Sequence, residues 1–348
     1  MKKVTLNDIA KKVGVSKTLV SLVVNGKARG YGISGQTCDK VMAAVRAYGY
    51  NPNQTARSLR TGMSNTLGLI VSDISNNFYA SLARQLEDLA WELGYNMIIG
   101  STDESVGKEL KLLEIFRNRQ VDGIILSSSQ QNPTELETLV KSGFPLVLID
   151  RYFPTVPIPS AVVNNKVGGV LLAQHLLNQG FRNPVVLSLT PSYISSVAER
   201  VEGFVSVFEN AAIHTEVHNI PFLCLVDMVE DFFTTRLHDK NMPDAVFAVN
   251  NNLATATLRA CHVHNIVIPK DIALVCFDEL PYFDFSKPSI TSIRQPVAEL
   301  CSVAFSLLLG QITNNGETKP GHVEMMPVEL LVRESSTQIS DNNGWRSP

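Results

Sequence analysis

The sequence predicts an α/β protein in which a small all-α unit precedes a larger core of parallel β-sheets. Residues 5–26 place apolar side chains at helical spacing on either side of a glycine-containing turn. From Leu67 onward, short apolar runs alternate instead with helical patterns. This alternation occurs once before about residue 160 and then restarts, so we expect the core to have two similar lobes.

Residues 5–26 have the parts of a helix-turn-helix. Thr5 is suited to cap a first helix, with Asp8 as its capping-box partner. Gly14 suits the left-handed turn that ends this helix, and Ser16 can cap a second one. The polar residues expected to face outward from the second helix are Lys17, Thr18 and Ser21. In this motif, the front of the second helix enters the major groove of DNA.

Any small three-helix domain could show the same spacing, and a third helix is expected after Ser34, ending before Pro52. The distribution of charge favours DNA binding. Residues 1–60 contain eleven Lys or Arg and two Asp, a net charge of +9, whereas the rest of the chain carries −12. Since electrostatics supplies most non-specific affinity for DNA, the basic unit is the expected contact surface.

Residues 53–62 connect this unit to the core and have no apolar stripe. One interpretation is a solvated linker, in which the exposed Leu59 needs no explanation. In the other, Leu59 inserts between base pairs in the minor groove while Arg57 and Arg60 contact phosphates. The residues alone favour the linker.

Composition excludes several classes of protein. A chain of 348 residues with 45% hydrophobic residues can form two or three globular units. No apolar stretch approaches the roughly 20 residues of a membrane span, and the N-terminus lacks the apolar run of a signal peptide. Five scattered cysteines without a C-x-x-C pair favour reduced thiols, so we expect a cytoplasmic protein without a metal site.

The core is expected to contain parallel sheets covered on both faces by helices. Amphipathic helices are predicted over 80–93 and 167–179, each followed by a glycine. Continuous apolar runs between such helices are typical of buried parallel strands. The predicted strands are 67–71, 96–99, 123–126, 146–149, 185–189, 245–249 and 273–277.

Polar and aromatic side chains follow the ends of these strands. In the first lobe they are Asp73, Phe78, Tyr79, Ser127, Asp150 and Arg151, and in the second they are Arg200, Asn250 and Asp278. In open α/β folds, ligands bind beyond the carboxyl ends of the strands. Carboxylate, amide and guanidinium groups beside aromatic rings suit a small polyol. Each residue alone has a plainer explanation, as a helix cap or a core residue, so only the joint pattern predicts a site.

No catalytic motif accompanies this pattern. The chain has no phosphate-binding G-x-x-x-x-G-K-[ST], no G-x-G-x-x-G after the first strand, no H-E-x-x-H and no G-x-S-x-G. His262 and His264 are two residues apart on a predicted helix and therefore point in different directions. We expect no catalytic residues, no cofactor and no bound metal.

Taken in order, these segments resemble the lactose-repressor/galactose-repressor family of bacterial transcription regulators from Val4 to about Ser336. The head matches in V-T-L-N-D-I-A-K-K-V-G-V-S and G-Y-N-P-N, and the linker matches in A-R-S-L-R-T-G. The core matches in D-G-I-I-L, L-I-D-R, R-V-E-G-F, I-A-L-V-C-F-D-E and S-I-T-S-I-R-Q-P. The resemblance implies a DNA-binding domain over 1–52, a hinge helix over 53–63, a periplasmic-binding-protein-like core over 64–336 and a polar tail over 337–348.

The resemblance also implies a homodimer that binds a roughly palindromic operator. The residues that would contact DNA are Thr5, Ser16, Lys17, Thr18, Ser21, Leu22, Asn25, Ala56, Arg57 and Leu59, with Leu59 at the minor-groove position. Those that would hold a small effector, commonly a sugar, are Phe78, Tyr79, Ser127, Asp150, Arg200, Asn250, Asp278 and Gln295. The function implied is an effector-controlled repressor.

Several residues depart from the family pattern. Leu22 stands where a base-reading arginine is usual, and a leucine can pack on a thymine methyl but cannot bond guanine, so a different operator is expected. Leu19, Asn77, Asn164, Asn251 and Cys276 are the other departures. An activator of the same family, a solute-binding protein of a sugar transporter and an enzyme on a doubly wound fold remain as alternatives. The basic head argues against the second, and the missing motifs argue against the third.

Overall fold

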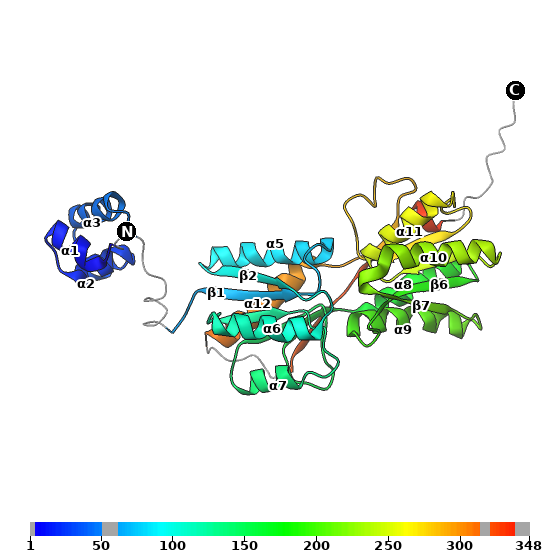
Figure 1. Ribbon diagram of the computed structural model, residues 1–348, viewed down its shortest axis with the longest axis horizontal. Coiled ribbons are helices and arrows are strands. Elements are labelled where there is room, and N and C mark those ends of the chain that lie inside the picture. Colours follow the sequence, from blue (N-terminus) through cyan, green and yellow to red (C-terminus); the bar gives the residue numbers. More distant parts are fainter. Residues whose placement is uncertain (1–3, 51–61, 314–320, 338–348) are drawn as a thin grey trace, which may run out of the picture. The chain divides into compact units, whose positions relative to one another are not determined.

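The computed structural model describes residues 4–50, 62–313 and 321–337 (Figure 1). These residues belong to two compact units, Met1–Ser64 and Asn65–Pro348, which we call the head and the core. Most of the expected hinge segment, including Ala56, Arg57 and Leu59, lies outside the described residues, as does the tail beyond Thr337. No helix in the described part of the chain combines the length and apolar character needed to cross a membrane.

The described residues of the head form three α-helices and one short 3-10 helix: α1 (Leu6–Val13), α2 (Lys17–Val24), η1 (Ala28–Tyr31) and α3 (Gly35–Ala47). The capping box between Thr5 and Asp8 is present, and Gly14 ends α1 with a φ of 76°. Ser16 caps α2, and Ser34 caps α3. The predicted caps at Thr5 and Ser16 are therefore confirmed, and η1 lies between α2 and α3.

The head is held together by one small apolar cluster. Ile9 of α1, Val20 of α2 and Val41 of α3 are fully buried at its centre, and Ala28 of η1 covers one side. The three helices therefore fix one another through side chains that sequence periodicity places on their inner faces. The polar residues of α2 lie on its outer face.

The first lobe of the core is built on a six-stranded parallel sheet in the order β11-β5-β4-β3-β1-β2. Its strands are β1 (Thr66–Val71), β2 (Asn96–Ser101), β3 (Gly123–Leu126), β4 (Leu146–Ile149), β5 (Ser160–Val163) and β11 (Val323–Met326). Its helices are α5 (Asn77–Glu92), α6 (Val106–Asn118), α7 (Thr134–Lys141) and α12 (Val297–Ile312).

The second lobe is built on a sheet in the order β12-β10-β9-β8-β6-β7, parallel except for the edge strand β12. Its strands are β6 (Pro184–Thr190), β7 (Glu216–Pro221), β8 (Ala245–Ala248), β9 (Ala273–Phe277), β10 (Thr291–Arg294) and β12 (Glu329–Leu331). Its helices are α8 (Asn165–Asn178), α9 (Ser195–Asn210), η2 (Phe222–Cys224), α10 (Leu225–His238), α11 (Asn251–Val263) and η3 (Glu334–Ser336).

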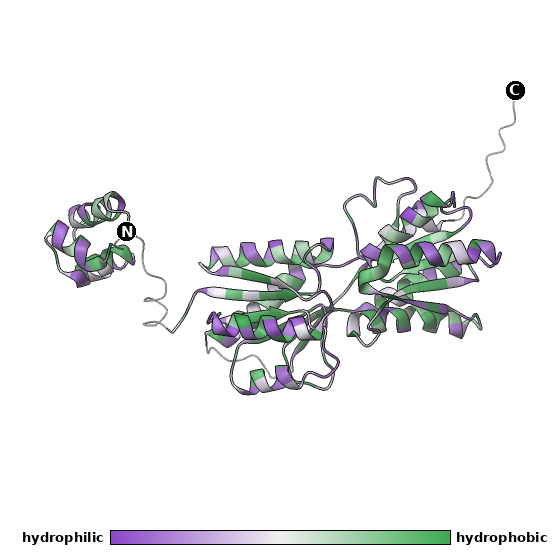
Figure 2. Cartoon of the chain, viewed as in Figure 1, coloured by the Kyte–Doolittle hydropathy of each residue, from purple (hydrophilic) through white to green (hydrophobic). Residues whose placement is uncertain are grey.

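The chain crosses between the lobes three times. It passes from β5 to α8, returns from β10 to α12, and crosses again from β11 to β12. Figure 1 shows these connections running between the two sheets. Figure 2 shows hydrophobic residues concentrated in the strands and polar residues on the outer helix faces, as expected for sheets covered on both sides.

All seven predicted strands are present, and their ends differ from the prediction by at most two residues. Both predicted helices begin earlier than expected: α5 at Asn77 and α8 at Asn165. Five strands were not predicted. β7, β11 and β12 are partly exposed edge strands whose polar residues interrupt the apolar run, and β5 and β10 are short strands of mixed composition.

Candidate functional site

A cavity lies between the lobes of the core, at the carboxyl ends of both sheets. The residues that line it from the first lobe are Ser72, Asp73, Asn76, Phe78, Tyr79, Glu104, Asp150 and Arg151. Those from the second lobe are Leu189, Ser196, Val197, Arg200, Phe222, Asn250 and Asp278. The free space is about 40 Å³, which is room for a few water molecules. We call this cavity the cleft.

On the first-lobe side, three predicted residues form one hydrogen-bonded group around Asp150. The Tyr79 hydroxyl donates to the Asp150 carboxylate at 2.8 Å and lies 3.1 Å from the Ser127 hydroxyl. Burial raises the pKa of Tyr79, so this phenol stays protonated as a donor. Phe78 packs edge-on against the Tyr79 ring, with the centroids 5.2 Å apart, and supplies an apolar surface beside the polar group.

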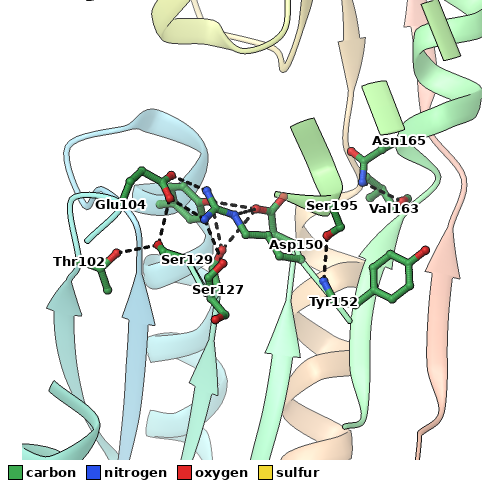
Figure 3. A network of polar contacts seen from close by, with 12 residues as sticks. Thr102, Glu104, Ser127, Ser129, Asp150, Tyr152, Val163, Asn165 and Ser195 are labelled. Atoms are coloured by element: carbon green, nitrogen blue, oxygen red, sulfur yellow. Dashed lines mark hydrogen bonds and ion pairs between the residues drawn. The ribbon is translucent and has the colours of Figure 1, made fainter. Parts of the chain in front are cut away.

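Glu104 and Arg151 form a buried, bidentate ion pair on the same side (Figure 3). The two distances from the guanidinium to Glu104 are 2.8 and 2.6 Å, and Arg151 also donates to the Ser128 carbonyl at 3.1 Å. Burial of Glu104 favours its neutral form, but the adjacent guanidinium and hydrogen bonds from Ser129 and Ser72 together lower the pKa of the carboxyl. Arg151 Nε lies 3.5 Å from Asp150 and has no hydrogen-bond partner among the described residues.

Arg200 occupies the second-lobe side and is held by groups behind it. Its Nε donates to Asn165 at 2.9 Å, Nη1 donates to the Val249 carbonyl at 3.0 Å, and its guanidinium stacks on the Phe277 ring with the charge 3.7 Å from the centroid. Its terminal nitrogens lie 3.8 Å from Asp150 and 3.9 Å from Asp278. This guanidinium therefore faces one carboxylate from each lobe.

Asp278 is buried at the end of β9. Gln295 donates to its carboxylate at 2.5 Å. Burial raises the pKa of Asp278, and the neighbouring Arg200 only partly opposes this effect. Asp278 and Asp150 both have left-handed backbones, with φ of 79° and 69°, so the two lobes present carboxylates through the same unusual local geometry.

Hydrogen bonds join the two lobes around the cleft. The side-chain amides of Asn76 and Asn251 pair reciprocally, at 2.9 and 3.0 Å, and both residues are buried. The Tyr152 hydroxyl donates to Glu199 at 2.8 Å. Burial, followed by the effect of this carboxylate, raises the pKa of Tyr152 to about 12. These contacts connect the ends of first-lobe elements to helices α9 and α11 of the second lobe.

The structure brings together the eight predicted effector-binding residues, but not all of them line the cleft. Six of the eight line the cleft: Phe78, Tyr79, Asp150, Arg200, Asn250 and Asp278. Ser127 and Gln295 lie behind it and bond to lining residues. The prediction missed Asn76, Glu104, Ser196 and Phe222 as lining residues. Glu104 and Phe222 follow β2 and β7 as the others follow their strands, so the same rule could have found them had β2 been given its full length and β7 been predicted.

In the head, the front of α2 exposes Ser16, Lys17 and Thr18, whereas Ser21 and Leu22 are half-buried. Leu19 is also half-buried and packs against the head core. Thr5 and Asn25, which are exposed, take part in local hydrogen bonds at the ends of α1 and α2. One polar and basic surface therefore surrounds the start of α2.

Comparison with known proteins places these features in a family. Residues 5–53 match the model of bacterial regulatory proteins of the lacI family, and residues 173–336 match a periplasmic binding protein-like domain. The chain is 32% identical to the HTH-type transcriptional regulator DegA of Bacillus subtilis, over 97% of this chain and 99% of that protein. It is 34% identical to a ribose operon repressor of Halalkalibacterium halodurans, over 95% and 97%.

Solved structures show the same fold. A lac repressor dimer bound to operator and the anti-inducer ONPF superposes with a TM-score of 0.83, at 22% identity, over 97% of this chain and all of that one. A periplasmic binding protein/LacI transcriptional regulator from Alkaliphilus metalliredigens, in complex with D-xylulofuranose, superposes with a TM-score of 0.66, at 24% identity, over 79% of this chain and all of that one.

Proposed function

Because the chain belongs to the lacI family of bacterial regulatory proteins, we propose that it is a homodimeric transcriptional repressor controlled by a carbohydrate effector. The observation that carries this proposal is that one chain joins a helix-turn-helix head to a cleft of polyol-binding groups. This role places the protein in the cytoplasm, where the operator is, and requires no catalytic turnover.

The head would read operator DNA with the front of α2. Lys17 and Thr18 are exposed where a recognition helix meets base edges, and Ser16 and Thr5 stand at helix N-termini, where backbone amides favour phosphate. Ser21, Leu22 and Asn25 complete the proposed surface on α2, and Ala56, Arg57 and Leu59 complete it from the hinge. Leu22 would contact thymine methyl groups in the absence of a guanine-binding arginine.

The cleft would hold the effector between the lobes. Asp150, Asp278 and Asn250 would bond hydroxyl groups, Arg200 would bridge the two lobes, and Phe78 would cover an apolar sugar face. Tyr79, Ser127 and Gln295 would orient these carboxylates through their hydrogen bonds. Since the free space is only about 40 Å³, a sugar must move side chains or separate the lobes to enter.

Effector and operator would compete or cooperate through the relative position of the lobes. A bound effector favours whichever lobe arrangement it contacts better, and linkage requires operator binding to change effector affinity by the same factor. The usual coupling free energy is about 1–3 kcal/mol. A hinge segment of about ten residues is marginal as an isolated helix, so its folding is a suitable step for this coupling.

Fluorescence anisotropy with genomic fragments selected by the full-length protein tests the proposal. We expect tight, salt-sensitive binding to one duplex family, altered by a sugar that binds the core. Lys17→Gln should weaken specific binding, whereas Lys270→Gln, with the same change of charge on an exposed core residue, should not. Equal affinity for all duplexes, with every sugar tried, would contradict the proposal.

A further inference from the structure

The cleft carries an excess of negative charge. Its charged lining residues are Asp73, Glu104, Asp150, Asp278, Arg151 and Arg200, which give a formal charge of −2. No lysine or histidine occurs among the described residues that line it. A ligand in this space therefore meets two more carboxylates than guanidinium groups, inside an environment that screens charge poorly.

The Arg151 guanidinium is already paired with protein groups. Both terminal nitrogens of Arg151 donate to Glu104, and one also donates to the Ser128 carbonyl. Its remaining Nε faces Asp150 at 3.5 Å, so an anion there would lie against a carboxylate. An anion could recruit Arg151 only by breaking a bidentate ion pair whose partners are each at most one-tenth exposed.

Two nitrogens of Arg200 are engaged, and the third, Nη2, lies 3.8 Å from the Asp150 carboxylate. Asn165 and the Val249 carbonyl accept two of its donors from behind, and Phe277 covers one face. The terminal nitrogens that approach the cleft do so between Asp150 and Asp278. A sugar hydroxyl can accept from one of these nitrogens while donating to either carboxylate, but a phosphate or carboxylate oxygen can only accept and would be repelled.

The helix ends at the cleft do not reverse this balance. Asn76 and Asn250 already accept amide hydrogens at the starts of α5 and α11. α9 begins without a side-chain cap, and its Ser196 and Val197 line the cleft, so its N-terminus adds a favourable partial charge. That charge is about half a unit, which is smaller than the excess of two carboxylates.

We propose that the effector is an uncharged sugar and that the cleft rejects the phosphate esters and carboxylates of the same sugar. The excess of acceptors matches ligands that donate many hydrogen bonds, and the carboxylates beside Arg151 and Arg200 offset the two positive charges that could otherwise attract an anion. This inference rests on the proposed function, because it names the chemical class of the effector in that same site.

Calorimetry with the full-length protein tests the proposal with matched pairs: ribose and ribose 5-phosphate, sucrose and sucrose 6-phosphate, glucose with glucose 6-phosphate, glucuronate and glucosamine. We expect at least one neutral sugar to bind, and its anionic partner to bind at least about 100-fold more weakly, as like-charge contacts of several kcal/mol require. Tighter binding of a phosphate ester or of glucosamine would overturn the inference but leave the proposed function standing. If no sugar bound, the inference and the carbohydrate part of the proposed function would both fail.

Glu104→Gln tests the physical cause. It removes one negative charge and weakens the hold on Arg151, so the preference for the neutral sugar should fall by about tenfold or more. Glu87→Gln, an exposed residue of α5 with the same change of charge, is the control and should leave the preference unchanged. Asp73→Asn, at a partly exposed lining residue, provides a second variant should Glu104→Gln not fold. An unchanged preference in the folded variant would contradict the charge argument.

Discussion

Two aspartates, Asp150 and Asp278, show how single residues shape the cleft. Each follows a fully buried strand, each has a left-handed backbone, and each lies within 4 Å of Arg200. Aspartate is among the few non-glycine residues that adopt this backbone, although it still costs free energy. Arg200 compensates this cost by placing one positive charge between two carboxylates, which makes it the residue on which the geometry of the cleft depends.

Replacing Arg200 with lysine should weaken effector binding even though the charge is kept. A lysine cannot donate to Asn165 and Val249 while also stacking on Phe277. We expect a loss of about 2–4 kcal/mol in binding free energy, measured by calorimetry with the sugar that binds the wild type. Arg259→Lys, on the exposed face of α11, is the control, and equal affinities in both variants would contradict this role.

The reciprocal amide pair between Asn76 and Asn251 should help to hold the lobes together. Asn76 Oδ1 accepts from both Asn251 and the Phe78 amide, so a carboxylate at position 251 would remove one donor and bring two oxygens face to face. Asn251→Asp should weaken this contact by about 1–2 kcal/mol. It should also enlarge the radius of gyration of the effector-free protein, measured by X-ray scattering. Asn252→Asp, with the same charge change, should leave the radius unchanged, and an equal radius in both variants would contradict the assignment.

Two glutamates of the first lobe should respond to pH in opposite directions. Burial opposes the charged form of Glu104, but Arg151 and hydrogen bonds from Ser129 and Ser72 together lower its pKa. Its stabilising contribution is therefore present above its ordinary value of 4.5 and is lost as pH falls through the lowered pKa. Burial raises the pKa of Glu109, so its contribution is complete below 4.5 and is lost as pH rises through the raised pKa.

Urea unfolding of the two glutamine variants across pH 3.5–7 measures this difference. The destabilisation caused by Glu104→Gln should grow as pH rises, whereas that caused by Glu109→Gln should shrink. Circular dichroism reports the unfolding of the core, and each variant serves as the control for the other. Two destabilisations that change in the same direction with pH would contradict the assigned pKa shifts.

At the scale of elements, the close contact between α8 and α9 positions Arg200. The two helices meet at Gly169 and Gly203, where an added Cβ would overlap the backbone of the facing helix. At Gly169 the overlapping atom would be the carbonyl oxygen of Arg200 itself. The absence of side chains at these two positions therefore sets how far α9 stands from α8, and with it the depth of Arg200 in the cleft.

Gly203→Ala should therefore destabilise the core and weaken effector binding together. The clash is with backbone atoms of Lys166, which cannot rotate away, so we expect a loss of about 1–3 kcal/mol in unfolding free energy. Gly107→Ala is the matched control, because at this position of α6 an added Cβ would meet only the Ser105 Oγ, at 4.0 Å, and alanine favours a helix by about 0.5–1 kcal/mol. Thermal unfolding and sugar titration of both variants measure the effect, and a Gly203→Ala protein of wild-type stability would contradict it.

The elements that sequence could predict are those defined by local rules. The caps at Thr5, Ser16 and Ser34 and the seven predicted strands follow from neighbouring residues alone, and the structure confirms them. Edge strands such as β7 depend on pairing with a distant partner, so their sequences show no clear apolar run. Glu104 was missed because its contact with Arg151 joins two residues 47 positions apart in the chain, which local sequence patterns do not show. The roles proposed for the residues of the head and cleft remain predictions.

At the scale of the whole molecule, the basic head and the acidic core give the two proposed binding activities different dependence on salt. Residues 1–60 carry a net charge of +9, and the rest of the chain carries −12. Operator binding through the head releases counterions from DNA and must weaken as salt rises, by a slope of about −0.9 for each phosphate contacted. An uncharged sugar in the cleft releases none.

Raising the salt concentration should therefore weaken operator binding steeply and leave sugar affinity almost unchanged. Anisotropy with the operator and calorimetry with the sugar, each from 50 to 300 mM potassium chloride, compare the two. Lys17→Gln should lower the slope for the operator by about one unit per head. A sugar affinity that fell with salt as steeply as operator affinity would contradict two statements: that charge affects the two binding activities differently, and that the effector is uncharged.

The three crossings between the lobes determine when each part can fold during synthesis. Each core sheet takes an edge strand from the end of the described chain, β11 over Val323–Met326 and β12 over Glu329–Leu331, and α12 packs on the first lobe only after the second has been made. The head is continuous within the first fifty residues and can fold while the ribosome is still translating the core. In the nascent chain the head can therefore fold before the core is complete. A messenger RNA truncated before codon 323 would yield a core in which both sheets lack an edge strand.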